Sequence, residues 1–168
     1  KPKVFKYMMK VKSYSNFQLI ALVLLRVVTG WYFLYEGLAK LLSPGWTSYG
    51  YLMDSQGLFA ELFKSMGQNQ ALMPIVDAVN IYGLIVIGLL LILGMFEKIG
   101  YIGAIVLLTM YYLSHPASLN VTYMLPPEGS YLWINKNIVM LCALIVMMAF
   151  PTAKRIGIDR IIFKNKKA

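Results

Sequence analysis

A long apolar segment from Phe17 to Leu42 constrains the fold of this chain more than any other feature. Its length suits a membrane-spanning helix, because about 20 apolar residues in a helix cross the hydrocarbon core of a bilayer. Three ionisable residues lie inside it: Arg26, Glu36 and Lys40. At about 100° per residue they fall within one arc of the helix, so one side is apolar and the other is polar. Charged groups in a membrane segment face a bundle interior, a cavity or a partner charge, which predicts further helices around this one.

Three more apolar segments follow, at about 74–96, 99–114 and 131–150. Hydrophobic residues make up 59% of the 168-residue chain, whereas a soluble domain would be near half apolar. We therefore predict an all-α protein, a four-transmembrane-helix bundle that occupies residues 17–150. The first apolar segment is too long for a signal peptide and lacks a cleavage site after it, so it is predicted to be retained.

The connection between the first two segments, residues 43–73, contains a short helical pattern. Its apolar residues recur at helical spacing, at Leu58, Phe59, Leu62 and Phe63. This spacing predicts a short amphipathic helix that lies at the membrane face or caps the bundle.

Basic residues concentrate at the two ends of the chain, in residues 1–16 and 151–168. They account for most of the net charge of +9. Basic segments that flank apolar spans are explained by topology and by anionic lipid, so we expect a bilayer as partner and no nucleic acid. The positive-inside rule then places both termini in the cytoplasm (N-in/C-in) and both long connections outside.

This topology brings polar residues of all four helices to one depth near the outer surface. The set consists of Glu36, Lys40, Asp77, Asn80, His115, Asn135, Lys136 and Asn137. Any one of them can be structural: Glu36 can pair with Lys40, and Asp77 with Lys136. Together they favour an outward-facing pocket, since four helices that place polar groups at one level exceed what helix packing requires. Its slightly cationic balance suits a small anion or the polar head of a quinone.

Arg26 lies deeper in the first helix and has no evident acidic partner in the sequence. It is therefore the first candidate for contact with a lipid-phase quinone or a neighbouring subunit. Trp31 and Tyr35 supply flat surfaces near the same spans and are grouped with Arg26 as quinone or partner contacts, although an interfacial aromatic belt is the commoner explanation for such residues. The chain has one cysteine, Cys142, and one histidine. We therefore expect no metal site, no iron–sulfur or zinc centre and no haem held by this chain alone.

Three motifs resemble the DoxX/DoxD family of membrane proteins: LLRVVTGWYFLYEGLAKLLSPGW, YYLSHP and EGSYLWINKN. The resemblance extends from about Phe17 to Asp159 and is closest to the DoxD-like branch, the membrane subunit of thiosulfate:quinone oxidoreductase. It implies a multi-pass protein of a bacterial or archaeal cytoplasmic (inner) membrane that oxidises thiosulfate to tetrathionate. It also implies a diffusible quinone as acceptor and a second subunit, either DoxA-like or a larger membrane complex.

Position in the predicted helices assigns roles to these residues within that reaction. Arg26, Lys40 and Lys136 hold the sulfur oxyanion or polarise a quinone carbonyl, and Glu36, Asp77 and His115 are the catalytic groups that handle protons. The substrate-binding set is Lys40, Asn80, Asn135, Lys136 and Asn137, and the quinone or partner contacts are Arg26, Trp31 and Tyr35. The rival hypothesis is a non-catalytic accessory or assembly subunit of a larger membrane complex. A channel or carrier for a small solute is a third.

Overall fold

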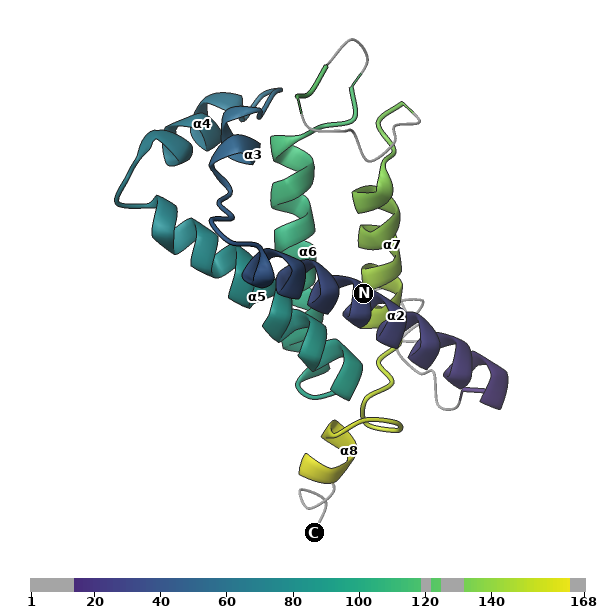
Figure 1. Cartoon of the computed structure of the whole chain (residues 1–168). Coiled ribbons are helices and arrows are strands. Elements are labelled where there is room, and N and C mark those ends of the chain that lie inside the picture. The colour runs from purple at the N-terminus through teal and green to yellow at the C-terminus, as the bar shows by residue number, and fades with distance from the viewer. Residues whose placement is uncertain (1–13, 119–121, 125–131, 164–168) are drawn as a thin grey trace, which may run out of the picture.

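A computed structural model describes residues 14–118, 122–124 and 132–163, and this part of the chain is helical with no strand. The helices are α2 (Asn16–Leu42), α3 (Tyr49–Met53), α4 (Ala60–Gln68), α5 (Met73–Leu93), α6 (Glu97–Ser114), α7 (Lys136–Ala149) and α8 (Asp159–Ile162) (Figure 1). The predicted all-α class is confirmed. Residues 1–13 of the basic N-terminal segment lie outside the described residues.

Each predicted span contains one long helix, but three helices have an end that differs by two residues or more from the expected one. α6 begins at Glu97, two residues before the expected start. α5 ends at Leu93 because Gly94 adopts a left-handed conformation, with φ 61°. α7 begins at Lys136 because the Asn135 side chain caps it. Among the described residues, α2 and α5 are long and apolar enough to cross a membrane, and α7 is a shorter apolar helix. The four-span bundle and its topology remain predictions.

The tightest helix packing joins α2 to α5. Three glycines let the two backbones approach: Gly30 and Gly37 on α2, and Gly88 on α5. A Cβ atom at Gly88 would lie only 2.5 Å from the backbone nitrogen of Leu34, so no larger residue fits there without moving the helices apart. α6 packs against both α5 and α7.

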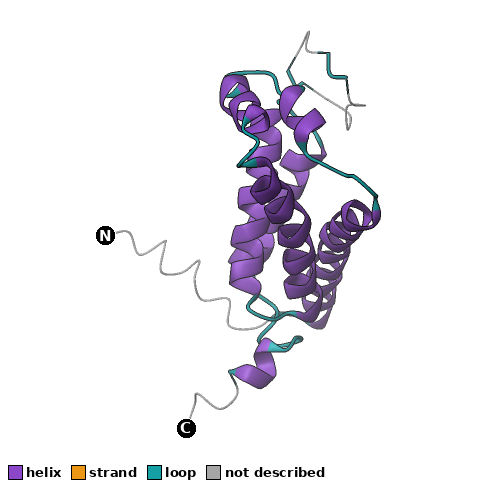
Figure 2. Cartoon of the chain, turned by 60° about the vertical axis from the view of Figure 1, so that its left-hand side comes forward, coloured by secondary structure: helices purple, strands orange, loops and turns teal. Residues whose placement is uncertain are grey.

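α3 and α4 lie at one end of this assembly and α8 at the other (Figures 1 and 2). We call these the α4 end and the α8 end. α4 lies in the connection for which the sequence predicted an amphipathic helix. Its Phe63 is buried, whereas Leu62 is 56% exposed.

Side chains from α2, α5, α6 and α7 meet in one core. Its fully buried members include Phe33, Leu91, Ala104, Leu108 and Leu144. The outward faces of the same helices carry many exposed large apolar side chains, such as Val28, Val86, Ile102 and Val139. A surface this apolar is rare on a soluble monomer and is typical of helices that lipid covers.

Candidate functional site

The ammonium of Lys40 is the centre of a polar cluster at the α4 end. It donates a hydrogen bond to Asn80 Oδ1 over 2.8 Å. It also lies 5.2 Å from the centre of the Trp46 ring and 5.5 Å from that of Tyr111, where the negative faces of the rings attract a cation. The Tyr111 hydroxyl donates to the same Asn80 oxygen over 3.1 Å. Two predicted substrate-binding residues, Lys40 and Asn80, are thus in direct contact, and they tie α2, α5 and α6 together.

Glu36 lies one helical turn before Lys40 on α2, so the two residues share a face of the helix. The Glu36 side chain is half-buried and makes no hydrogen bond or ion pair with the residues that the structure describes. The structural pairing of Glu36 with Lys40 is therefore absent, because the ammonium bonds to Asn80 instead.

Lys136 approaches the same face of α2 from the start of α7. Its Nζ lies 4.6 Å from the centre of the Tyr32 ring. Tyr32 is one turn before Glu36, so Glu36 lies on the helix between a residue that contacts Lys136 and Lys40 itself. One face of α2 therefore has two cationic groups, Lys136 at Tyr32 and Lys40 itself, with the Glu36 carboxylate between them along the helix.

The two predicted asparagines beside Lys136 have different environments. Asn135 caps α7, because its side-chain oxygen accepts a hydrogen bond from the backbone N–H of Ile138 over 3.2 Å. Asn137 is 7% exposed and faces the interior of the helix assembly. The cap gives Asn135 a structural role that is independent of any substrate.

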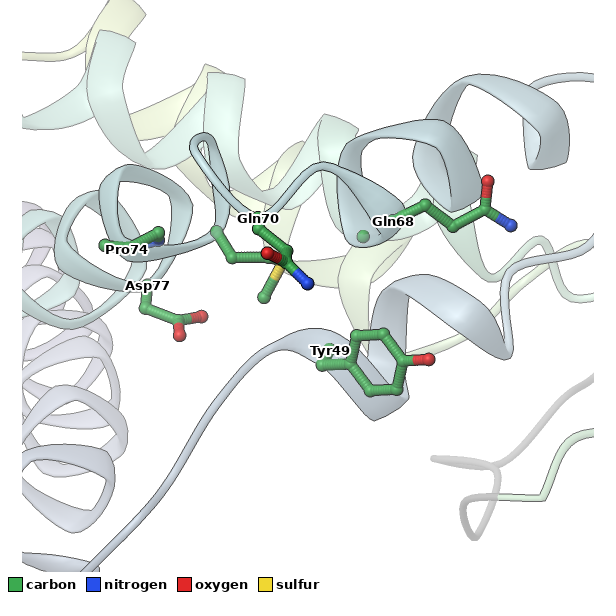
Figure 3. Close-up of a pocket in the computed structure, with 7 residues that line it drawn as sticks. Tyr49, Gln68, Gln70, Pro74 and Asp77 are labelled. Atoms are coloured by element: carbon green, nitrogen blue, oxygen red, sulfur yellow. The ribbon is translucent and has the colours of Figure 1, made fainter.

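Asp77 ties α5 to the segment that precedes α3. Its Oδ1 accepts hydrogen bonds from the Ser48 backbone nitrogen over 2.8 Å and from the Ser48 hydroxyl over 2.5 Å. The alternative pairing of Asp77 with Lys136 is not formed. Asp77 also lines an open cavity of about 580 Å³, into which its carboxylate points (Figure 3). The cavity is lined by Tyr49, Gly67, Gln68, Gln70, Met73, Pro74 and Asp77.

His115 follows α6 and is enclosed by protein side chains. Its ring stacks on Tyr51 at a centroid distance of 3.9 Å and lies 4.6 Å from the Tyr123 ring. Its Nε2 is 3.7 Å from Asp54 Oδ2, and its Nδ1 is 3.1 Å from the Ser114 hydroxyl. These contacts leave the His115 ring 13% exposed. The role of His115 in substrate proton transfer stays a prediction.

Arg26 lies in a second polar cluster, towards the α8 end. Its guanidinium is 2% exposed and donates to the Thr152 hydroxyl and to the Ile156 carbonyl, each over 2.8 Å. The carboxylate of Glu97 is 3.7 Å away. The expectation that Arg26 has no acidic partner is therefore wrong, because the sequence does not reveal that the start of α6 reaches the middle of α2. Contact of Arg26 with a quinone or a subunit stays a prediction. Such a contact would have to reach a side chain that is buried in this structure.

The acidic residues of this cluster hold the C-terminal segment. Glu97 Oε2 accepts hydrogen bonds from the backbone nitrogens of Thr152 and Ala153 over 3.2 and 3.0 Å. Asp159 accepts from the backbone nitrogens of Phe96 and Glu97, at the start of α6, over 2.8 and 3.3 Å. The cluster therefore fastens residues 152–159 under the bundle, which is a structural task.

Trp31 and Tyr35 lie on the opposite face of α2 from Arg26. Their side chains are 58% and 60% exposed, and their rings are 6.5 Å apart. The structure thus separates them from Arg26, with which the sequence grouped them as quinone or partner contacts. Their exposure suits either a lipid interface or a partner surface.

Sequence reasoning missed Asp54, Glu97, Asp159 and Tyr111 as polar cluster members. Asp54 stands in a long connection, and Glu97 and Asp159 stand in or next to charged segments that resemble solvated turns. These three acidic residues are only 3% to 6% exposed, and their burial depends on contacts with distant residues. Only Tyr111 could have been predicted from the sequence, because it lies next to Tyr112 near the end of a predicted span, at the depth of the other polar residues.

The two long apolar helices, the apolar outward faces and the buried polar clusters at both ends are typical of a membrane protein. A family model described as DoxX matches residues 21–116, which comprise most of α2 and all of the chain up to the end of α6. The chain belongs to the DoxX family. Comparison with curated proteins and with solved structures gave no significant match.

Proposed function

We propose that this DoxX-family protein is the membrane subunit of a quinone-linked oxidoreductase that oxidises a small sulfur anion. The observation that carries the proposal is the Lys40 ammonium, which Asn80 and two aromatic rings hold in a partly buried place on an apolar helix. A cation held in a poorly solvated place attracts an anion more strongly than one in water. Glu36, one turn away, supplies a carboxylate for proton exchange.

The proposed reaction joins two thiosulfate ions into tetrathionate and releases two electrons. A quinone takes these electrons and two protons to become a quinol. Lys40 and Lys136 hold the oxyanions in this scheme, and Glu36 passes protons to the reduced quinone. We assign the anion to Lys40 rather than to the cavity beside Asp77, since that cavity is lined by one carboxylate and no basic side chain.

The test is quinone reduction by the purified protein in lipid nanodiscs, with and without any subunit that co-purifies. We expect thiosulfate-dependent loss of quinone absorbance, and at least a tenfold decrease in kcat/KM in Lys40→Met, because one charge contact in a poorly solvated site contributes about 1.4 kcal/mol or more. Lys98→Met is the matched control, since Lys98 is exposed at the other end of the bundle. Full activity in Lys40→Met, or no turnover in any preparation, would contradict the proposal.

A second candidate function is a non-catalytic accessory subunit of a larger membrane complex. It is favoured by the engagement of Asp77, Asn80 and Asn135 in contacts within the chain, as helix packing alone requires. Stable co-purification with a larger complex, loss of that complex on deletion of this chain and an absence of thiosulfate turnover would support this candidate.

A further inference from the structure

The open cavity beside Asp77 is a second polar feature of the α4 end, apart from the Lys40 cluster (Figure 3). Its walls come from α3, from the last turn of α4 and from the segment that leads into α5, and no residue of the Lys40 cluster lines it. Its volume of about 580 Å³ lies within the range of sites that hold small organic molecules. The cavity therefore has room for a ligand larger than a single ion.

The two oxygens of the Asp77 carboxylate have different environments. Oδ1 accepts both hydrogen bonds from Ser48, one from the backbone nitrogen and one from the hydroxyl. Oδ2 accepts no hydrogen bond from the residues that the structure describes, and none of their basic side chains forms an ion pair with Asp77. The protein thus holds the half-buried carboxylate by one oxygen and leaves the other for a ligand in the cavity.

The two helix ends at the cavity favour a cation over an anion. Gly67 and Gln68 are the last residues of α4, so the negative end of that helix dipole faces the cavity. The start of α5 on the opposite wall would attract an anion through free N–H groups. However, the Met73 nitrogen already donates to the Asn69 carbonyl over 3.1 Å, and Pro74 has no N–H.

The remaining lining suits a positively charged group on a carbon chain. The side chains of Tyr49 and Gln70 make no hydrogen bond with other described residues, so their oxygens are open to a donor. In Figure 3 the Asp77 carboxylate and the Gln70 amide extend into the space that Tyr49 borders. The Tyr49 ring offers its face to a cation, and Met73 supplies an apolar wall for carbon atoms.

We propose that this cavity binds a protonated primary amine on a short carbon chain. The ammonium has three N–H donors and no acceptor, and it donates to Asp77 Oδ2 and to the Gln70 amide oxygen beside the Tyr49 ring. A metal ion is a poorer match, because the cavity supplies one carboxylate and the described residues include no group of three or more His, Cys, Asp or Glu side chains that could hold one.

The amine is either a free alkylamine or the headgroup of an aminophospholipid, since both present the same donors. Leu72 and Ile75, beside the lining residues Met73 and Pro74, are 40% and 59% exposed and offer an apolar flank to a lipid chain. No basic side chain lines the cavity, so a lipid phosphate would remain outside it. The proposal does not depend on the proposed oxidoreductase function, which uses Lys40.

The first test is a titration of the full chain in detergent with propylammonium chloride at about pH 7.5, where an alkylamine is protonated. Propylammonium is expected to raise the Tm more than the same concentration of potassium chloride does, because a ligand of the folded state stabilises it. Asp77→Asn keeps an oxygen for the Ser48 hydrogen bonds and removes the charge. It is expected to weaken propylammonium binding about tenfold.

Glu61→Gln is the matched control, because Glu61 is an exposed acid on α4 that does not line the cavity. Its affinity for propylammonium is expected to equal that of the wild type. Wild-type affinity in Asp77→Asn would overturn the proposal. So would a rise in Tm no greater than that given by potassium chloride.

A pair of substitutions at Gln70 tests the cavity even if Asp77→Asn fails to fold. Gln70 is exposed and its side chain has no partner among the described residues, so both variants are expected to fold. Gln70→Lys places a competing cation in the cavity and is expected to abolish propylammonium binding. Gln70→Glu adds a second carboxylate and is expected to strengthen it. Equal affinity in the two variants would refute the site.

Native mass spectrometry of protein released from lipid nanodiscs distinguishes the two sources of the amine. The nanodiscs contain equal amounts of phosphatidylethanolamine and phosphatidylcholine, whose trimethylated nitrogen has no N–H donor. Preferential retention of phosphatidylethanolamine by the wild type but not by Asp77→Asn would identify a lipid headgroup as the ligand. Equal retention of both lipids, together with propylammonium binding that depends on Asp77, would identify a free amine. Absence of both effects would overturn the proposal.

Discussion

The guanidinium of Arg26 lies 3.7 Å from the carboxylate of Glu97, with 2% and 3% of the two side chains exposed. Arg26 belongs to the middle of α2 and Glu97 to the first residue of α6, so this pair joins two helices that are distant in sequence. It also supports the C-terminal segment, because Arg26 donates to Thr152 and Glu97 accepts from its backbone nitrogen. The pair therefore connects three parts of the chain.

Replacement of Glu97 by glutamine is expected to destabilise the protein by about 3 kcal/mol. The amide retains an acceptor for the backbone of Thr152 but leaves Arg26 as a buried charge without its counter-ion. The measurement is unfolding of the purified protein in detergent micelles, with Lys98→Gln as control. Lys98 is the exposed neighbour of Glu97, and its replacement is expected to change the stability by less than about 0.5 kcal/mol. Equal stability of the two variants would show that the ion pair contributes nothing.

Two glycines of α5 give a matched pair of substitutions. A Cβ atom at Gly88 would lie 2.5 Å from the Leu34 backbone nitrogen, whereas a Cβ atom at Gly83 would lie 3.8 Å from the Leu107 side chain. Gly88→Ala must therefore separate α2 from α5, with an expected cost of about 2 kcal/mol or more. Gly83→Ala is expected to be neutral or to stabilise the helix by up to about 1 kcal/mol, since alanine is the better helix former. Thermal unfolding of both variants checks the order, and a reversed order would refute the close α2–α5 contact.

The raised pKa of Tyr14 leads to a prediction about the stability of the protein at alkaline pH. Burial raises the pKa of Tyr14 and the Glu97 carboxylate adds to this, while Arg155, whose guanidinium lies 4.7 Å from the ring centre, opposes it. The folded protein therefore keeps the phenol protonated after the unfolded chain has lost the proton. Stability from this group is present below about pH 10 and is lost as the pH rises above it.

Tyr14→Phe is accordingly expected to reduce the loss of Tm between about pH 9 and about pH 11. The hydroxyl also donates to the Pro151 carbonyl over 3.1 Å, so the variant is expected to be slightly less stable at neutral pH. Tyr49→Phe, on an exposed ring at the α4 end, serves as control. An alkaline profile of Tyr14→Phe that equals the wild-type profile would contradict this assignment.

Membrane topology can be tested by cysteine labelling after Cys142→Ala removes the single, exposed native thiol. Ser65→Cys on α4 is expected to react with an impermeant maleimide added to intact cells, because the positive-inside rule puts this connection outside. Arg160→Cys on α8 is expected to react only after the membrane is permeabilised. Both serine and arginine are exposed in the structure, whereas Ser55 in the same connection as Ser65 is fully buried and unsuitable. The opposite labelling pattern would invert the topology.

The helices were predictable because their signal is local. A long run of apolar residues predicts a helix wherever the rest of the chain lies, and α2 begins and ends within one residue of the predicted segment. The predicted positions of helix ends were less accurate where a single residue sets the end. Gly94 ends α5 early through its positive φ, and the Asn135 cap delays the start of α7.

The candidate site was predictable in part. Helical spacing correctly put Glu36 and Lys40 on one face of α2, and it gave Asp77 and Asn80 to the start of the next long helix. It could not show that Lys40 bonds to Asn80 rather than to Glu36, because that choice depends on the rotation and approach of two separate helices. The same limit concealed Glu97 as the partner of Arg26 and Asp54 as the neighbour of His115.

The sequence by itself determined that this protein is helical, that its helices are apolar outside, and which of their faces carry charge. These properties follow from the spacing of residues within one segment, where backbone geometry sets the neighbours. Only the tertiary structure decided which charges meet and which polar groups are buried. The partners belong to segments far apart in the chain, so their contact is set by the close α2–α5 packing and by the return of the C-terminal segment to Arg26 and Glu97.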